Sequence, residues 1–383
     1  MLEATDFAIL PWDWPIGDQE TFNQMHECGF NLAGFVAPEH LDLVKQAGLK
    51  GIVFERNNQV GNAEAQLDEK EIARRVEALV NRVDHHPAAF GYYLRDEPGA
   101  DIYPGLKMWA DAYNKFAPGS LAYINLFPNY ASAEQMNVPT YAEYLESYIR
   151  IVQPSYISYD HYAMMDDGSL RGGYFQNLEA VRSQAQRNSI PFWNIVLANS
   201  HFHYAEPTPA TLRFQLYTTL AYGARGISYF TYFAPRVGNY RLAPVDQFGY
   251  KTPTWDMLRN VNLQLHRIGP TYIGLKSTQV FHHPDVPAGC AGIATSQLVA
   301  TLEGESGESE TRFLVGEFEG MSGEPYALVV NKSLYRSTAF QITFKLPGRV
   351  FLLNAYTGQI EPWTGEQVWL APGQGMLLCI KKE

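Results

Sequence analysis

The chain has 383 residues, of which 46% are hydrophobic and 18% charged, and its formal net charge is −11 at pH 7. This length and composition predict an ordinary globular protein with one large domain and a smaller one. The excess of acids and the lack of any lysine and arginine cluster make nucleic acid an unexpected partner. The sequence has no run of about 18 apolar residues, so we predict no membrane span.

Up to about residue 270 the chain repeats one pattern, a short strand rich in aromatic and β-branched residues, then a turn, then a helix with apolar residues at 3–4 spacing. The predicted strands are 7–10, 32–35, 51–54, 89–94, 121–126, 156–159, 192–197 and 226–232. The predicted helices are 19–28, 40–46, 69–83, 106–116, 142–152, 178–187, 209–222 and 255–268. This is the size and rhythm of a (β/α)8 TIM barrel, an α/β fold. A doubly wound sheet would need a glycine-rich turn after its first strand, where Pro11-Trp-Asp-Trp-Pro15 stands.

After residue 270 the pattern changes to strands without helices. The predicted strands are 278–282, 298–303, 313–319, 326–331, 339–344, 350–353, 367–370 and 375–380. Turn residues every 8–12 positions are typical of an antiparallel β-sandwich. We therefore predict two domains, a barrel over residues 1–270 and a smaller all-β sandwich over residues 271–383.

The fourth predicted strand runs directly into Arg95-Asp96-Glu97-Pro98-Gly99. Catalytic groups of TIM barrels lie at the carboxyl ends of the strands, so this position makes Glu97 a catalytic candidate. The alternative is that the Asp-Glu pair caps the helix that follows, since acids are common at helix amino termini.

The other strand ends supply aromatic rings, amides and carboxylates with little positive charge, a set that suits a neutral polyhydroxylated ligand better than a phosphate. The high aromatic content, 14%, agrees with this because aromatic faces pack against the apolar faces of sugars. We predict that substrate contacts come from Trp12, Trp14, Arg56, Asp96, Asn125, His161, Tyr162, Asn199, Tyr229 and Tyr232. Among these, the predicted sugar platforms are Trp12, Trp14, Tyr162 and Tyr232.

Hydrolysis of a glycosidic bond needs one protonated carboxyl for the leaving oxygen and one ionised carboxylate that attacks or activates water. Glu97 suits the first role, because the neighbouring Tyr92, Tyr93 and Pro98 would desolvate it and raise its pKa. Asp160, which ends the sixth strand, is the best second carboxylate, although a structural or ligand-orienting role for it is equally consistent with the sequence. The reserves are Glu206 and Glu55.

Metal and thiol chemistry have weaker support. His161, His201 and His203 fall at the same rim, but no HExxH-type spacing accompanies them, so we predict neither a metal nor another cofactor. A metal-dependent hydrolase on the same scaffold is the third hypothesis. The three cysteines have no CxxC spacing and are expected to be small buried groups.

At this point the chain resembles the TIM-barrel glycoside hydrolases of the large clan A type, which a β-sandwich often follows. The resemblance is carried by Gly91-Tyr-Tyr-Leu-Arg-Asp-Glu-Pro98, Ser158-Tyr-Asp-His-Tyr162 and residues 223–232, and in the tail by residues 326–332 and 370–378. It implies that Glu97 is the general acid/base and that Asp96 touches the sugar beside the cleaved bond.

One departure from the pattern bears on mechanism. Retaining members of that clan carry a nucleophilic Glu at the end of the seventh strand, but here residues 193–200 end in Asn199 and Ser200. The sequence therefore leaves retaining and inverting hydrolysis open. The leading prediction is a glycoside hydrolase acting on an oligo- or polysaccharide, with Glu97 and Asp160 as the catalytic pair, and the alternative is a carbohydrate-binding barrel that has lost hydrolysis.

The amino terminus does not look like a signal peptide. If Met1-Leu-Glu-Ala4 was left by removal of such a peptide, a secreted or periplasmic location is favoured, and otherwise a cytoplasmic one. The expected partner is a carbohydrate, and the sequence predicts no particular oligomeric state.

Overall fold

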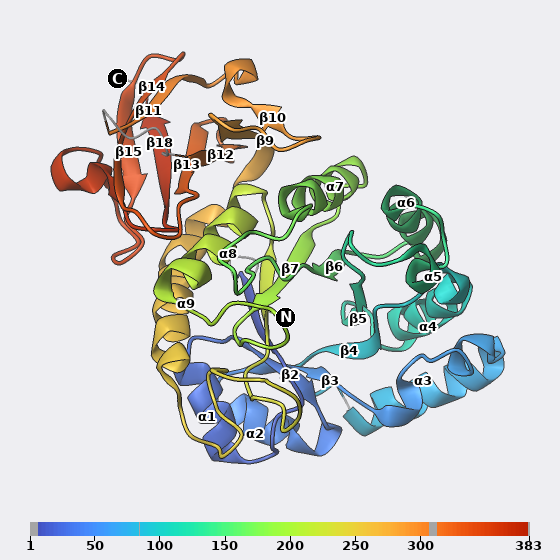
Figure 1. Ribbon diagram of the computed structural model, residues 1–383. Coiled ribbons are helices and arrows are strands. Elements are labelled where there is room, and N and C mark those ends of the chain that lie inside the picture. Colours follow the sequence, from blue (N-terminus) through green and yellow to red (C-terminus); the bar gives the residue numbers. More distant parts are fainter. Residues whose placement is uncertain (1–6, 84, 306–311, 382–383) are drawn as a thin grey trace.

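The computed structural model describes residues 7–83, 85–305 and 312–381. The amino-terminal residues 1–4, which bear on the expected location, lie outside the described residues. Within it, eight parallel strands form one sheet in the order β1-β8-β7-β6-β5-β4-β3-β2. The predicted TIM barrel is confirmed (Figure 1). The strands are β1 (Ala8–Trp12), β2 (Leu32–Val36), β3 (Lys50–Val53), β4 (Ala89–Asp96), β5 (Leu121–Leu126), β6 (Ile157–Asp160), β7 (Phe192–Leu197) and β8 (Gly226–Phe230).

One side chain bridges the barrel seam between β1 and β2. The Asn31 amide donates to the carbonyl of Phe7 and accepts from the N–H of Ile9, each at 2.8 Å. Gly34 is required at this seam, because a Cβ there would lie 2.4 Å from the carbonyl oxygen of Asp13. The Asn31 amide thus replaces part of the backbone ladder between the first two strands.

The helices of the barrel flank its strands (Figure 1). In α3 the buried residues Ile72, Val76, Leu79 and Val83 recur at 3–4 spacing and give the helix one apolar face. The helices are α1 (Gln19–Glu27), α2 (Leu41–Gln46), α3 (Glu69–Val83), α4 (Tyr103–Phe116), α5 (Ala133–Met136), α6 (Tyr141–Val152), α7 (Tyr174–Arg187), α8 (Pro209–Ala221) and α9 (Pro253–Tyr272). Short 3-10 turns are η1 (Pro38–His40), η2 (Arg56–Asn58), η3 (Glu64–Gln66), η4 (Ala100–Ile102), η5 (Ile293–Thr295) and η6 (Gly365–Val368).

The second part of the chain is all-β, as predicted, with α9 ending at Tyr272 and β9 beginning at Lys276. In the described range it has a seven-stranded sheet, β10-β9-β12-β13-β18-β15-β16, and a three-stranded sheet, β11-β14-β17. Of the strand predicted over residues 367–370, the first half is the end of the turn η6, and the second half, Trp369 and Leu370, pairs with β14. The strands are β9 (Lys276–His283), β10 (Ala291–Gly292), β11 (Val299–Gly304), β12 (Phe313–Glu319), β13 (Pro325–Asn331), β14 (Thr338–Phe344), β15 (Arg349–Leu353), β16 (Ile360–Pro362), β17 (Trp369–Leu370) and β18 (Gly375–Lys381).

Helix α8 lies between the barrel and the second part of the chain, and every residue from Thr211 to Ala221 except Arg213 is buried. On the barrel side the Gln215 amide pairs with both backbone groups of Leu197 in β7 at 3.0 Å. On the other side the backbone of Gly316 in β12 packs so closely on Ala221 that a Cβ would meet its carbonyl oxygen at 2.2 Å. The all-β part therefore covers a face that an isolated barrel would leave apolar and exposed.

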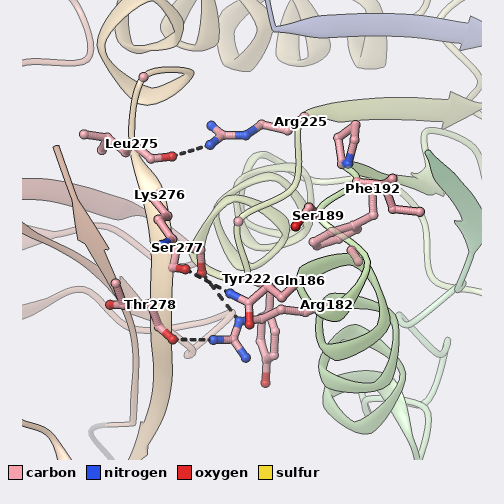
Figure 2. Close-up of a pocket in the computed structure, with 15 residues that line it drawn as sticks. Arg182, Gln186, Ser189, Phe192, Tyr222, Arg225, Leu275, Lys276, Ser277 and Thr278 are labelled. Carbon is pink, nitrogen blue, oxygen red and sulfur yellow. Dashed lines mark hydrogen bonds between the residues drawn. The ribbon is translucent and has the colours of Figure 1, made fainter. Parts of the chain in front are cut away.

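A cleft of about 770 Å³ lies just past the end of α8, between the end of α7 and residues 274–278 at the start of β9 (Figure 2). Its polar side chains tie the two parts together. Arg182 donates to the carbonyl of Thr278 at 2.9 Å, Gln186 donates to that of Ser277 at 2.9 Å, and Arg225 donates to that of Leu275. The cleft adjoins Phe192 at the start of β7, so it lies at the opposite end of the barrel from the carboxyl ends of the strands.

None of the helices in the described residues combines the length and the apolar composition needed to cross a membrane. Cys28 and Cys379 are buried and Cys290 is half-buried, and all three are free thiols.

We predict that Arg182→Ala lowers the free energy of unfolding by about 2–4 kcal/mol, because it removes both the charged hydrogen bond from this buried guanidinium to the carbonyl of Thr278 and its ion pair with Glu179. Arg187→Ala, on the exposed side of the same helix, serves as the matched control and should change it by less than about 0.5 kcal/mol. Urea denaturation of both variants measures the difference. Equal stabilities for the two variants would contradict the role given to Arg182.

Candidate active site

Strand β4 delivers Asp96 and Glu97 to the rim through a β-bulge at Leu94. The register passes from Tyr93 opposite Tyr123 to Arg95 opposite Ile124, so Leu94 is the extra residue. The bulge moves the pairing along by one position, and Asp96 rather than Arg95 lies opposite Asn125.

Glu97 follows in the left-handed backbone region, with φ at 46°. This conformation is uncommon for a non-glycine residue and is imposed by neighbours. The N–H of Glu97 donates to the carbonyl of Asn125 at 2.9 Å, and the next carbonyl, that of Pro98, accepts from the Tyr144 hydroxyl at 2.7 Å. The surrounding chain therefore holds Glu97 in a fixed direction at the end of β4.

The side-chain amide of Asn125 bridges two carboxyl groups. Its Nδ2 donates to Oδ1 of Asp96 at 3.1 Å and to Oδ1 of Asp160 at 2.9 Å. Asn125 is buried, so its two N–H groups are occupied by acids of the neighbouring strands β4 and β6. Asn125 thereby connects the two acids that sequence analysis placed on different strand ends.

Two hydroxyl groups fix the orientation of this amide. Oδ1 of Asn125 lies 2.9 Å from Oγ of Ser158, which lies 3.2 Å from the Tyr123 hydroxyl. Because an amide oxygen can only accept, Ser158 must donate to it, and Tyr123 must then donate to Ser158. The network therefore has one direction, from Tyr123 through Ser158 to Asn125 and on to the carboxylates.

All three acids hold their protons more tightly than isolated carboxyl groups do. Burial raises the pKa of Glu97 to about 7, helped by the charge of Asp96 and opposed by that of Arg95. Burial raises the pKa of Asp96 to about 6, against the Asn125 hydrogen bond. The pKa of Asp160 is raised well above its usual value by burial first and then by the charges of Glu97 and Asp96. After burial, negative charge therefore opposes ionisation of Glu97, through Asp96, and of Asp160, through both Glu97 and Asp96.

Aromatic side chains stand around the three acids. Trp14 is 48% exposed, and its ring packs on Phe35 at 4.9 Å and on Tyr93 at 6.0 Å between centroids. Tyr162 packs against Phe230 at 5.4 Å, and the charges of Asp160 and Asp96 contribute to the raised pKa of its hydroxyl. Of the four predicted sugar platforms, Trp14 and Tyr162 retain accessible surface.

The other two predicted platforms and Tyr229 lie in the core. Trp12 is 4% exposed and packs inside the barrel against Phe35 at 4.7 Å. Tyr229 and Tyr232 have no exposed surface and pack against Phe30, outside the barrel sheet. These rings offer no open face in this conformation.

The remaining predicted contact residues divide into two groups. Arg56 is exposed on η2 beyond β3. His161 and Asn199 are buried. Asn199 is bonded to Thr231 and His201, and His161 Nδ1 lies 3.0 Å from Asn177, whereas His161 Nε2 has no hydrogen-bond partner among the described residues. His203, which the sequence suggested only as a possible metal ligand, is exposed, and its Nδ1 lies 3.7 Å from Oδ2 of Asp166.

The reserve acids are both paired with arginines away from the cluster. Glu55 lies 2.9 Å from Arg82 of α3, and Glu206 lies 2.8 Å from Arg241. In the described part of the chain, no three His, Cys, Asp or Glu side chains are grouped in a way that would hold a metal ion.

Sequence reasoning missed Tyr130, Ser158 and Tyr123 as members of the site. Tyr130 is 38% exposed, and its ring lies 4.3 Å below the guanidinium of Arg171 and near enough to Asp160 for that charge to raise its pKa. The signal was present for Tyr130, which directly follows Asn129 after the fifth strand. Ser158 and Tyr123 lie within strands and gave no such signal.

Comparison with solved structures finds the same architecture in proteins of very different sequence. A protein described as a glycoside hydrolase aligns with a TM-score of 0.62 at 12% identity, over 98% of this chain and 93% of its own. A glycoside hydrolase family 5 protein from Bacteroides vulgatus aligns at 0.60 and 12%, over 98% and 89%. A β-galactosidase from Marinomonas ef1 aligns at 0.55 and 12%, over 71% of this chain, which spans 62% of that longer protein.

This chain shares its fold with solved glycoside hydrolases. At this identity the likeness establishes the fold, and the two alignments over 98% of the chain include the all-β part as well as the barrel. The resemblance expected from the sequence is thus confirmed for the architecture. No family model matches the sequence, and a search of curated proteins also gives no match.

We predict that Asn125→Ala raises the pKa values of Asp96 and Asp160 further, because both lose their side-chain donor. Carbon-13 NMR titration of the aspartate carboxyl groups measures this directly. Asn194→Ala is the matched control, since Asn194 is also buried on a barrel strand but donates to Thr219 at 2.8 Å. If both variants titrate as the wild type does, the Asn125 bridge does not act on the acids.

We also predict that Glu97→Gln stabilises the protein at high pH. The raised pKa means that folded Glu97 resists ionisation, so wild-type stability falls as pH rises from about 4.5 through about 7. A glutamine never ionises, so the variant should match the wild type at pH 4 and exceed it by up to about 3 kcal/mol at pH 8. Urea denaturation at the two pH values tests this, and a difference that does not depend on pH would contradict it.

Proposed function

We propose that the protein is a glycosidase that cleaves O-glycosidic bonds of a neutral oligo- or polysaccharide. The observation that carries this proposal is the position of Glu97 and Asp160 at the carboxyl ends of β4 and β6, where burial and then the charge of Glu97 raise the pKa of Asp160, and Asn125 joins Asp160 to Asp96, the neighbour of Glu97. Two carboxyl groups that cannot both ionise readily meet the requirement of glycoside hydrolysis for one acid and one base.

The hydrogen bonds favour placing the proton on Glu97. Asn125 donates to Asp160, which stabilises its ionised form against the opposing effect of burial. Among the described residues no side chain donates a hydrogen bond to the Glu97 carboxyl, and Glu97 is more accessible than Asp160. A leaving oxygen can therefore reach the group that holds the proton.

In the proposed reaction the Glu97 carboxyl gives its proton to the glycosidic oxygen as the bond to the sugar carbon breaks. Asp160 then either takes a proton from an attacking water molecule or attacks the sugar carbon itself. Asp96 contacts a sugar hydroxyl, and Trp14 and Tyr162 supply the ring faces beside it. The configuration of the released sugar, followed by NMR, separates the inverting from the retaining route.

We predict that Glu97→Gln lowers kcat by at least about 100-fold, the scale expected for loss of a general acid. Wild-type activity should fall above about pH 7 as Glu97 loses its proton. The assay is release of sugar from a panel of aryl glycosides and polysaccharides. Glu55→Gln, another acid after a barrel strand but paired with Arg82, is the control and should remain active. Full activity of Glu97→Gln would refute the assignment.

A second candidate function is carbohydrate binding without turnover. It is favoured by the end of β7, where Leu197 is followed by Ala198, Asn199 and Ser200 in place of a glutamate. Binding of polysaccharides by both the wild type and Glu97→Gln, with no sugar released by either, would support this function over hydrolysis.

A further inference from the structure

A groove of about 470 Å³ lies between the barrel rim and the all-β part, away from the three acids. Its walls come from three segments, the loop after β6, the loop after β7 with the first turn of α8, and the β13–β14 loop. The lining of the groove includes Asp166, Glu206, Arg213, Leu334 and Tyr335. The groove opens at the carboxyl ends of the strands, because both barrel loops follow strand ends.

One hairpin separates this groove from the acids. The loop after β6 folds back on itself, with the N–H of Arg171 donating to the carbonyl of Ala163 at 2.7 Å and that of Met165 to Ser169 at 3.0 Å. Met165 and Ser169 line the groove. At the base of the same hairpin the Arg171 guanidinium covers Tyr130, which is near enough to Asp160 to feel its charge. The hairpin therefore forms one wall of the groove and, at its base, lies beside the residues around Asp160.

Tyr335 of the all-β part closes the groove from the far side. Its side chain is 76% exposed, and its hydroxyl lies so near Gly168 that a Cβ there would be 2.8 Å away. The loop that carries it is ordered by hydrogen bonds, because Oγ of Ser333 accepts from the N–H groups of Tyr335 and Arg336. An exposed aromatic ring is thus held in place above a groove whose lining is mostly apolar, with a few charged side chains.

The charges of the lining nearly balance. Asp166 and Glu206 are about half exposed, Glu206 pairs with Arg241, and Arg213 donates to the carbonyl of Pro372 at 2.9 Å. Such a lining attracts neither a phosphate nor a strongly cationic ligand. It offers acceptors for hydroxyl groups together with one ring face, and the volume lies within the range of small-molecule sites.

We infer that this groove is a distal subsite for a neutral glycan whose reacting end lies at Glu97 and Asp160, with the Tyr335 ring stacked on a sugar face. The inference rests on the proposed function for the identity of the ligand. It makes the all-β part a contributor to substrate binding as well as a cover for α8. Short substrates that end before the hairpin would not reach Tyr335.

The test compares Tyr335→Ala with the wild type on an aryl monosaccharide glycoside and on oligosaccharides of increasing length from the same polysaccharide. KM for the long oligosaccharides should rise by about five-fold, the scale of one aromatic contact, while both constants for the aryl glycoside stay unchanged. Tyr335→Phe keeps the ring and should behave as the wild type does. Equal KM values for Tyr335→Ala and the wild type at every length overturn the inference.

A binding assay separates this inference from the proposed function. If the wild type releases no sugar, affinity electrophoresis in gels containing galactan, galactomannan, xylan or β-glucan replaces the kinetics. Loss of retardation in Tyr335→Ala then supports the groove although hydrolysis has failed, and unchanged retardation overturns it. Met321→Ala is the matched control, because Met321 is 91% exposed in the β12–β13 turn and lies near Gly274 rather than the groove.

Discussion

The carboxyl groups of Asp96, Glu97 and Asp160 lie at one barrel rim, and Arg95 is the neighbouring arginine that offsets their charge. Much of the candidate site depends on how the negative charge of these three groups is accommodated. In a buried setting the acids cannot all ionise, so each keeps its proton to a higher pH than it would in water. A network of neutral donors compensates in part. Asn125 contributes hydrogen bonds to two acids without adding charge, and its orientation is fixed by Ser158.

The barrel supplies this cluster by topology. Neighbouring parallel strands end at the same edge, so Asp96, Asn125 and Asp160 come together from β4, β5 and β6 although they are far apart in sequence. Outside the barrel strands, helix α8 also brings separate segments of the chain together. Because it is buried from both sides, it joins the barrel to the all-β part, with a groove at its first turn and a cleft beyond its last.

Most of the architecture was predictable because its signals are local. Strand and helix periodicity located the βα units to within a few residues, and β5, β7 and α3 begin and end where the pattern placed them. The short elements α5, β10 and β16 were missed, since segments of two to four residues carry too little periodicity to be recognised. Residues 367–368 form a turn where a strand was expected, because the alternation there is also compatible with an exposed loop.

The grouping of the candidate acids at one rim was predictable from the sequence, the positions of the aromatic side chains were less so, and the difference has a physical origin. Side chains alternate across a strand, so in β8 Tyr229 faces the helices while Phe230 faces the barrel interior, where it meets Tyr162. Counting alternate residues along β8 would have identified Phe230, rather than Tyr229, as a ring that faces the barrel interior. The same count fails in β4, because the bulge at Leu94 inserts a residue and reverses the alternation before Asp96. Since that bulge is fixed by pairing with β5 rather than by local sequence, the contact between Asp96 and Asn125 emerges only when the whole sheet is assembled.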